Sequence, residues 1–599
     1  MNMLTVSQRI EALREQMQTH GIDAWLVYTA DPHLSEYLPA HWSQREYLSG
    51  FTGSAGYMAV TQQAAALWTD SRYWVQAEAE LQGSSIELMK QGASDTPKLE
   101  DWVKSQLSPD QVVGVNGMAL SVSQALSLEN SFAQADIELV VEHELLEAFW
   151  QDRPALPQAA IYEHAAKYVG LPRQAKLKQV REAMEAAGCQ VHLISSLDDI
   201  AWVLNLRGSD VEYNPVFLSH LILTAERAIL CVEPSKLSEA LKQSLAEDSV
   251  ELLAYDAVED CLAELMADDE SNLLIDAVRT AWSICEPYTE QAVLALNPSQ
   301  RLKASKNDKE IAHIRHAMEK DGAALCEFFA EFEKRLVAGD ELSELDVDEM
   351  ITAARARQEG FVSPSFATIA GFNANGALPH YRALPEAYSM IEGDGLLLID
   401  SGGQYVDGTT DITRVVPIGH ITDAHKKDYT LVLKGMINLS MAVFPVNEPG
   451  PNLDAIARLP LWQAGLDFGH GTGHGVGYFL NVHEGPQSIS HYGYGRPDAE
   501  MKEGMITSNE PGLYRPGQWG IRIENLVLNQ PAFKTEFGDF LKFETLTLCP
   551  IDTRCIDLNL LREDERAWLN NYHQEVRERL LAYVEGDTKS WLLQRTEAI

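Results

Sequence analysis

Apolar residues near the start of the chain recur at helical spacing and then give way to a short apolar run. Four of them share one face: Val6, Ile10, Leu13 and Met17. This spacing predicts a helix over residues 5–20, closed by Gly21, because glycine readily adopts the left-handed conformation that ends helices. The run AWLVY at residues 24–28 then predicts a buried strand.

The same order of elements returns later in the chain. A shift of 167 positions superposes identical residues: Arg14 on Arg181, Glu15 on Glu182, Met17 on Met184, Gly21 on Gly188 and Asp31 on Asp198. Helix, strand and loop recur in the same order as these identities. We therefore predict two related α/β domains in the first half of the chain.

Two further patterns divide the chain. Residues 150–158 (WQDRPALPQ) contain two prolines that favour an extended linker, and Asn307 with Glu310 forms a capping pattern that opens a long helix. Near the end, apolar and aromatic residues return to helical spacing: Trp568, Tyr572, Val576, Leu580 and Tyr583. We place three domains at residues 1–157, 158–306 and 307–599.

Between residues 400 and 524 the pattern changes to short strands that end in acidic residues. Gly395–Ile399 is a continuous apolar run that leads into Asp400, and the turn at Asp407-Gly408 returns the chain through Asp411. Eleven positions separate the two aspartates, so a bent hairpin can bring them together, although the pattern leaves the register open. A second segment repeats this arrangement with Glu510 before a turn and Glu524 on the returning strand IRIENLVL.

These four carboxylates, together with His474, form a candidate metal site. One acid in a turn is most often a helix cap or a solvated group, but four acids at mirrored strand ends need a shared partner. Oxygen ligands with one imidazole and no thiolate suit Mn, Mg, Fe or Co better than a thiolate zinc site. A pair of divalent cations would offset the repulsion among four negative charges.

Histidines gather in the same part of the chain. Four of the 17 histidines fall within about a hundred residues: His380, His470, His474 and His483. One histidine alone is more often a satisfied core residue than a ligand. In the segment HGTGH the flanking glycines predict that the backbone approaches a ligand closely.

Composition limits the function classes. The net charge of −41 and the isoelectric point near 4.7 argue against nucleic acid or an anionic membrane as partner. The seven cysteines are scattered and contain no CxxC pair, which predicts structural thiols in a reducing compartment. The first 17 residues have no apolar signal core, and no run of about 18 apolar residues occurs. A cytoplasmic location is the simplest expectation.

Taken together, these segments resemble the three-domain cytosolic Xaa-Pro aminopeptidases (aminopeptidase P). These belong to the pita-bread family, with prolidase, methionine aminopeptidase and creatinase. The resemblance covers nearly the whole chain. Its motifs are YTADPHLSEYL, SGFTGSAG and LWTDSRY in the first half, and NANGALPHY, DSGGQYVDGTTDITR, HGTGHGVG, LNVHEGP, SNEPG and IRIEN in the second.

The resemblance implies a role for each candidate residue. Asp411, His474 and Glu510 match positions that hold one metal ion, Asp400 and Asp411 match those that hold the other, and Glu524 matches the carboxylate bridging both. It also implies that Glu510 is catalytic and passes a proton. His380, His470 and His483 match catalytic and substrate-contacting histidines. Arg72 and Arg522 match arginines that we include among the substrate-binding residues.

The resemblance therefore predicts fold and function together. We expect an α/β (α+β) chain with two creatinase-like domains before a pita-bread catalytic domain that ends in a helical extension. The expected activity is hydrolysis of the bond before a second-position proline in peptides, with two Mn²⁺ per subunit, or Co²⁺ or Zn²⁺ in their place. A homodimer is expected, whose N-terminal half narrows the entrance to the cleft, without nucleic acid or membrane partners. Two alternatives stay open: a prolidase restricted to dipeptides, and a catalytically silent binding protein.

Overall fold

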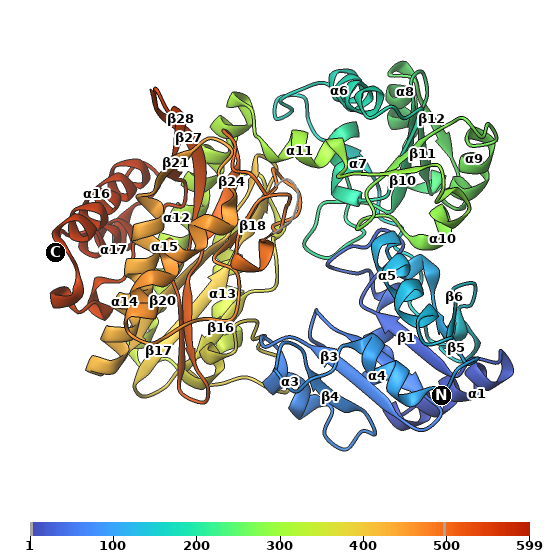
Figure 1. The fold of residues 1–599 in the computed structure, drawn as a ribbon. Coiled ribbons are helices and arrows are strands. Elements are labelled where there is room, and N and C mark those ends of the chain that lie inside the picture. Colours follow the sequence, from blue (N-terminus) through green and yellow to red (C-terminus); the bar gives the residue numbers. More distant parts are fainter. Residues whose placement is uncertain (1–3, 495–498) are drawn as a thin grey trace. The chain divides into compact units, whose positions relative to one another are not determined.

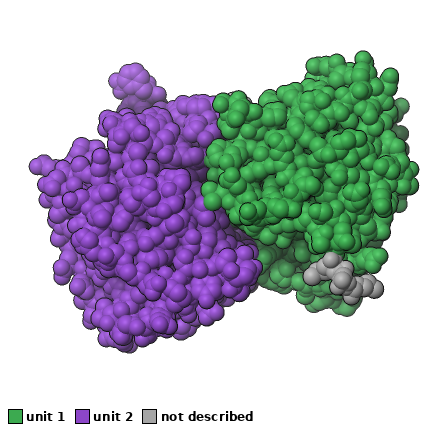
Figure 2. Space-filling model, turned by 90° about the horizontal axis from the view of Figure 1, so that it is seen from below, with its two compact units in different colours: residues 1–163, 171–212, 216–299 green, residues 164–170, 213–215, 300–599 purple. Residues whose placement is uncertain are grey.

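The computed structural model describes residues 4–494 and 499–599, and the chain separates into two compact units (Figure 2). The N-terminal unit comprises residues 1–163, 171–212 and 216–299. The C-terminal unit comprises residues 164–170, 213–215 and 300–599. Residues 300–306 therefore group with the C-terminal unit, whereas the three domain limits that we place from sequence remain predictions. In the described part of the chain, no helix has the length and apolar character needed to cross a membrane.

The N-terminal unit contains two six-stranded sheets (Figure 1). In spatial order, the first consists of β4 (Glu87–Lys90), β3 (Ala65–Thr69), β2 (Tyr57–Thr61), β1 (Ala24–Tyr28), β5 (Val112–Val115) and β6 (Glu138–Val140). The second consists of β12 (Val250–Leu253), β11 (Ala228–Val232), β10 (Ser219–Thr224), β8 (Val191–Ile194), β13 (Leu273–Ile275) and β14 (Ala292–Leu294).

The two sheets repeat each other strand by strand. In the first sheet, β1 pairs antiparallel with β2 and parallel with β5. In the second sheet, β8 pairs antiparallel with β10 and parallel with β13. Helix α1 (Val6–Thr19) precedes β1, and α6 (Arg173–Ala186) precedes β8. The helix and strand that we predict for residues 5–28 are thus present, with a Thr5–Gln8 capping box at the start of α1. The predicted internal repeat is confirmed.

The two repeats are joined by their backbones and by a common apolar cluster. Trp282 N donates to the Leu120 carbonyl at 2.7 Å, and Val122 N donates to the Thr280 carbonyl at 3.1 Å. Ala24 of the first repeat and Val191 of the second belong to the same buried cluster. Because burial and hydrogen bonds continue across the junction, the two repeats form one unit.

The C-terminal unit contains a long helix and two principal sheets. Helix α12 (Asp308–Ala338) starts at the predicted capping box, in which the Asn307 side chain accepts from Glu310 N. One sheet has the order β16 (Ile369–Phe372), β17 (Gly395–Ser401), β20 (Ile412–Ile418). The other has the order β21 (Val443–Pro445), β28 (Gly538–Thr545), β27 (Asn525–Thr535), β24 (Ile506–Asn509). Further helices are α11 (Pro298–Ala304), α13 (Glu344–Ala356), α14 (Asp423–Ser440) and α15 (Gly450–Gln463).

The end of the chain packs as helices against α12 and α14 (Figure 1). Helix α16 (Glu563–Leu580) is followed by α17 (Gly586–Arg595). Our prediction that Tyr583 continues α16 is wrong, because the chain turns after Leu580. The Tyr583 hydroxyl instead donates to Glu319 on α12 at 2.9 Å.

The buried His573 on α16 allows us to predict how low pH affects the packing of the C-terminal helices. Its Nε2 accepts from Ile551 N at 3.0 Å, and burial, together with Arg414 and Arg577, lowers its pKa to about 4. In the unfolded chain His573 would bind a proton near pH 6.5, whereas in the folded protein it stays neutral down to about pH 4. The free energy of unfolding is therefore unaffected by His573 above pH 6.5 and falls as the pH drops from 6.5 toward 4. At pH 5 this effect amounts to about 2 kcal/mol.

We expect His573→Gln to lose less thermal stability than the parent between pH 7.5 and pH 5, as measured by calorimetry. The exposed His420 provides the control, since His420→Gln should retain the parent's pH dependence. An identical pH dependence in His573→Gln and the parent would contradict the assignment.

Candidate metal centre

The first pair of acids lies on one antiparallel hairpin. Asp400 lies in β17 opposite Thr413 of β20, and Asp411 directly precedes β20. Between these strands, β18 (Gly403–Tyr405) and β19 (Gly408–Thr409) form the predicted tight turn. The structure thus supplies the register that the pattern left open.

The second pair comes from the other sheet. Glu510 directly follows β24, and Glu524 lies between β26 (Trp519–Arg522) and β27. Our prediction of one continuous strand through IRIENLVL is therefore wrong. The strand is interrupted there because the Glu524 backbone N–H donates to Thr413 O at 3.2 Å and the Thr413 hydroxyl donates to the Glu524 carboxylate at 2.7 Å. These bonds join the two hairpins at the site.

Ligand atoms of three residues lie within 4.8 Å of one another: Asp411, His474 and Glu524. His474 Nε2 is also 3.4 Å from a Glu510 oxygen and 3.5 Å from an Asp411 oxygen. Asp400 is joined to the group through Arg522, whose guanidinium donates to Asp400 Oδ2 at 2.6 Å and lies 4.0 Å from Glu510. The structure therefore brings all five predicted ligands to one place.

Burial and concentrated negative charge shift proton equilibria within the group. Burial, with repulsion from Asp411 and Glu510, raises the pKa of Asp400 to about 7 even though Arg522 opposes it. Burial and the other carboxylates also raise the pKa of Glu510 and of Glu524, the latter strongly. Burial disfavours the His474 imidazolium, yet Asp411 and Glu510 raise its pKa to about 9. The site has an excess of negative charge that a cation would relieve.

Arg522 connects the acids to an aromatic side chain and a histidine. Besides Asp400, it donates to the Tyr514 hydroxyl at 2.6 Å and to the Thr413 hydroxyl at 3.2 Å. The Tyr514 hydroxyl is 2.8 Å from His470 Nε2. Thr413 and Tyr514 were not among our predicted residues. Tyr514 had a visible signal, since acid, glycine and tyrosine follow one another in both paired segments.

The orientation of His474 is set by its neighbours. Its Nδ1 lies 2.9 Å from the Gly475 carbonyl, so Nδ1 carries the proton and Nε2 faces the carboxylates. Its backbone N–H donates to Ser508 Oγ at 2.9 Å, and Ser508 Oγ donates to Glu510 at 3.0 Å. Ser508 is a further residue that the sequence did not single out.

Gly473 within HGTGH and Gly475 directly after it lie close to neighbouring backbone. A Cβ on Gly473 would lie 1.9 Å from the Ser508 carbonyl oxygen, and one on Gly475 would lie 1.9 Å from the Glu484 carbonyl oxygen. The absence of side chains lets this segment approach neighbouring backbone. Our expectation that it also approaches a ligand closely stays a prediction.

The remaining predicted residues differ in their placement. The His483 ring lies 4.3 Å from the His474 ring, centroid to centroid. His470 has both ring nitrogens engaged, Nδ1 with the Gly471 carbonyl at 2.7 Å and Nε2 with Tyr514. His380 is half-buried in the turn after the short helix at Asn373–Ala377. Arg72 belongs to the N-terminal unit, where its guanidinium makes a two-point ion pair with Asp70 at 2.8 Å.

The donor set fits a pair of divalent cations. One oxygen of Asp400 and one of Glu524 are buried without a hydrogen-bond partner. Buried carboxylate oxygens without a partner are costly unless a cation or water binds them. Together with His474 Nε2, they provide the oxygen-rich ligands that hard cations prefer.

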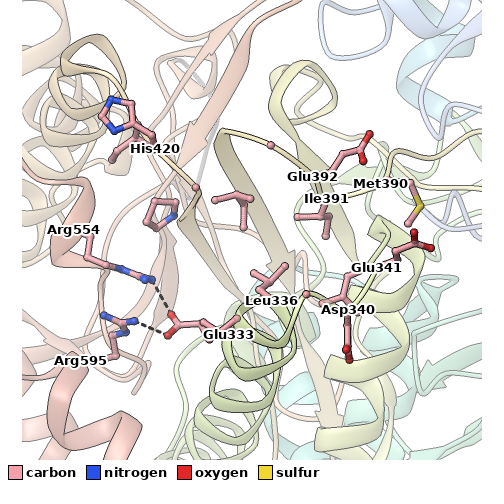
Figure 3. Close-up of a pocket in the computed structure, with 18 of the residues that line it drawn as sticks. Glu333, Leu336, Asp340, Glu341, Met390, Ile391, Glu392, His420, Arg554 and Arg595 are labelled. Carbon is pink, nitrogen blue, oxygen red and sulfur yellow. Dashed lines mark hydrogen bonds and ion pairs between the residues drawn. The ribbon is translucent and has the colours of Figure 1, made fainter.

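A concave region of about 890 Å³ lies apart from these residues (Figure 3). It is lined by the end of α12 and by segments that include residues 390–393 and 417–421. Within it, Glu333 accepts from Arg554 at 2.8 Å and from Arg595 at 2.5 Å. These ion pairs fasten α17 and the segment before α16 to α12. None of the predicted site residues lines this region, so we assign it to that attachment.

Comparison with known sequences agrees with this geometry. A profile of metallopeptidase family M24 matches residues 312–530, and one of its C-terminal region matches residues 539–599. Profiles of the creatinase/prolidase N-terminal domain match residues 9–149 and 152–310. Aminopeptidase P2 of Arabidopsis thaliana is 40% identical over 635 residues, covering 100% of this chain and 89% of that protein. This chain belongs to metallopeptidase family M24.

Two further relatives extend this M24 comparison. A probable Xaa-Pro aminopeptidase P of Coprinopsis cinerea is 38% identical, covering 99% of this chain and 98% of that protein. The crystal structure of X-prolyl aminopeptidase from Caenorhabditis elegans matches with a TM-score of 0.95 and 33% identity over 100% of both chains. That protein is described as a cytosolic enzyme with a di-nuclear active site. The predicted creatinase-like and pita-bread architecture of this M24 metallopeptidase is thereby confirmed.

Proposed function

We propose that this M24 metallopeptidase is a Xaa-Pro aminopeptidase that releases the N-terminal residue from peptides with proline in second position. The observation that carries the proposal is the convergence of four carboxylates, three of them buried, with His474 in a chain whose full-length relatives bear that activity in their names. A proline nitrogen in a peptide bond carries no hydrogen, so the bond before it needs a dedicated enzyme.

In this proposal Asp400, Asp411, His474, Glu510 and Glu524 hold two Mn²⁺ ions, for which Co²⁺ or Zn²⁺ can substitute. When bound, the two ions lower the pKa of a water molecule and so supply a nucleophile at neutral pH. Glu510, whose carboxylate lies 3.4 Å from His474 Nε2, would take the water's proton and pass it to the leaving proline nitrogen. The water oxygen would bond to the carbonyl carbon, and the bond between that carbon and the proline nitrogen would break as the nitrogen receives the proton.

The remaining histidines have separate roles in this proposal. We propose that His483 donates to the developing oxyanion, since its ring adjoins that of His474, and that His380 and Arg72 contact the peptide. Because both ring nitrogens of His470 are engaged, the role we predict for it from sequence becomes support of Tyr514 and, through it, Arg522. Arg522 holds Asp400 in place, close to the region where the free amino terminus would bind.

Substrate length tests the activity. We expect release of the first residue from a tripeptide or longer peptide with proline second, because an aminopeptidase recognises the free amine and leaves the remaining chain free to extend. Xaa-Pro and Xaa-Pro-Pro peptides are compared after dialysis against Mn²⁺. Turnover of the dipeptide alone would favour a prolidase, and metal-free, inactive protein would favour a silent binding protein.

Substitution of a metal ligand should affect metal content and activity, whereas substitution of a substrate-contacting histidine should affect activity alone. Glu524→Gln and Asp411→Asn remove charge that offsets the cations, so we expect loss of bound metal together with activity. His483→Ala and His380→Ala should keep two metals per subunit and lose roughly 10²–10³ in turnover. Metal content is measured by mass spectrometry beside kinetics on one peptide. Loss of both metals from His483→Ala, or full metal and rate in Glu524→Gln, would contradict this division.

We also propose a cytoplasmic homodimer, which rests on the resemblance to the three-domain family. Light scattering at the concentration used for assays should give twice the mass of 66.6 kDa. A fully active monomer would refute the dimer.

A further inference from the structure

Next to His483 in the chain lies a buried ion pair that the proposed chemistry does not use. Lys306 Nζ donates to Glu484 Oε1 at 2.6 Å, and both side chains are only 1% exposed. Lys303 Nζ lies 3.9 Å from the other oxygen of the same carboxylate. Two ammonium groups therefore face one glutamate in the interior of the C-terminal unit.

The lysines come from the segment that precedes the catalytic fold. The creatinase/prolidase profile extends to residue 310, whereas the M24 profile starts at residue 312. Nevertheless, residues 300–306 pack with the C-terminal unit. Lys306 N donates to the Gly504 carbonyl at 2.9 Å, and Ser305 forms a bridge with Met505. This junction is thus fixed to the start of the segment that continues through β24 to Glu510.

Glu484 reaches the candidate metal centre through its backbone. Its N–H donates to the Gly475 carbonyl at 2.8 Å, and the same carbonyl lies 2.9 Å from His474 Nδ1. A side chain held by Lys306 and a backbone held by Gly475 restrain Glu484 at both ends. Because His483 directly precedes Glu484, its backbone is restrained with it.

Stability alone does not account for this pair. Taking two charges out of water costs several kcal/mol per ion, and an apolar pair of similar volume is often as stable. A pair at 2.6 Å does, however, fix the two chains it joins in one relative position, because an isolated buried charge would be strongly unfavourable. The pair therefore serves to fix the relative position of the segments that carry Lys306 and Glu484.

We infer that Glu484 and Lys306 are positioning residues that hold His483 at the reaction site, so that the junction before α12 is part of the catalytic apparatus. This inference rests on the proposed function, in which His483 contacts the oxyanion.

The direct test separates turnover from binding. Glu484→Gln keeps the shape of the side chain but removes its charge, and Lys306→Met removes the ammonium group. Each should lower kcat about 10–100-fold, the loss usual for residues that orient a catalytic group. KM and the content of two metals per subunit should stay within twofold of the parent. Lys306→Arg, which retains the charge, should recover most of the lost turnover.

A matched control comes from another buried lysine–glutamate pair of the same unit. Lys434 on α14 donates to Glu565 on α16, also at 2.6 Å, with side-chain exposures of 13% and 0%. Lys434→Met should lower the melting temperature comparably to Lys306→Met and leave kcat unchanged. Equal losses of kcat in the two variants would show that destabilisation alone explains the effect and would overturn the inference.

The decisive measurement combines two substitutions. If Glu484 acts through His483, Glu484→Gln should lower kcat in the parent and have little further effect in His483→Ala, whereas independent roles give additive losses. Additive losses, or an unchanged kcat in Glu484→Gln, would refute the inference. Absence of Xaa-Pro turnover in the metal-loaded parent would instead refute the proposed function, so the two failures are distinguishable.

Discussion

The gathering of four carboxylates at one point, three of them buried and Glu510 partly exposed, is the constraint on which the site depends. Repulsion and desolvation raise the pKa values of Asp400, Glu510 and Glu524, so without counter-charge the site would favour protonated acids. The protein supplies part of that counter-charge as Arg522, which is itself buried and contacts Asp400 directly. The remainder suits divalent cations. A protein that keeps such a cluster accepts a cost in stability for a function.

Hydrogen bonds that orient the ligands come from several separate segments. Thr413 on β20 holds Glu524, Ser508 on β24 holds both His474 and Glu510, and the Gly475 carbonyl fixes the imidazole. Glu524 and His474 are therefore each held by a residue on another element, whereas Glu510 is held by a neighbour in its own segment. These hydrogen bonds join the two hairpins into one site. Those between Thr413 and Glu524 also account for the break between β26 and β27.

The N-terminal half is built from two repeats that are joined into one unit. Its two repeats share a strand order but are not independent bodies, because backbone bonds and one apolar cluster cross between them. The segment that leaves this half, residues 300–306, belongs by contact to the C-terminal unit. The chain thus changes unit before the long helix begins, and Lys306 places a charge from this segment against Glu484, the residue after His483.

The sequence by itself determined the local elements and the kinds of residue at the site. Periodicity placed the first helix and strand, the capping box at Asn307 placed α12, and paired acids at strand ends indicated the candidate ligands. These depend on neighbours in the chain, where spacing is informative. Only the tertiary structure decided the register that sets Asp400 opposite Thr413, the partners Thr413, Ser508 and Tyr514, and the buried pair of Lys306 with Glu484. Those contacts join residues as many as 178 positions apart. A hydroxyl or an ammonium group has no signal in a local pattern until folding places a carboxylate within hydrogen-bonding distance.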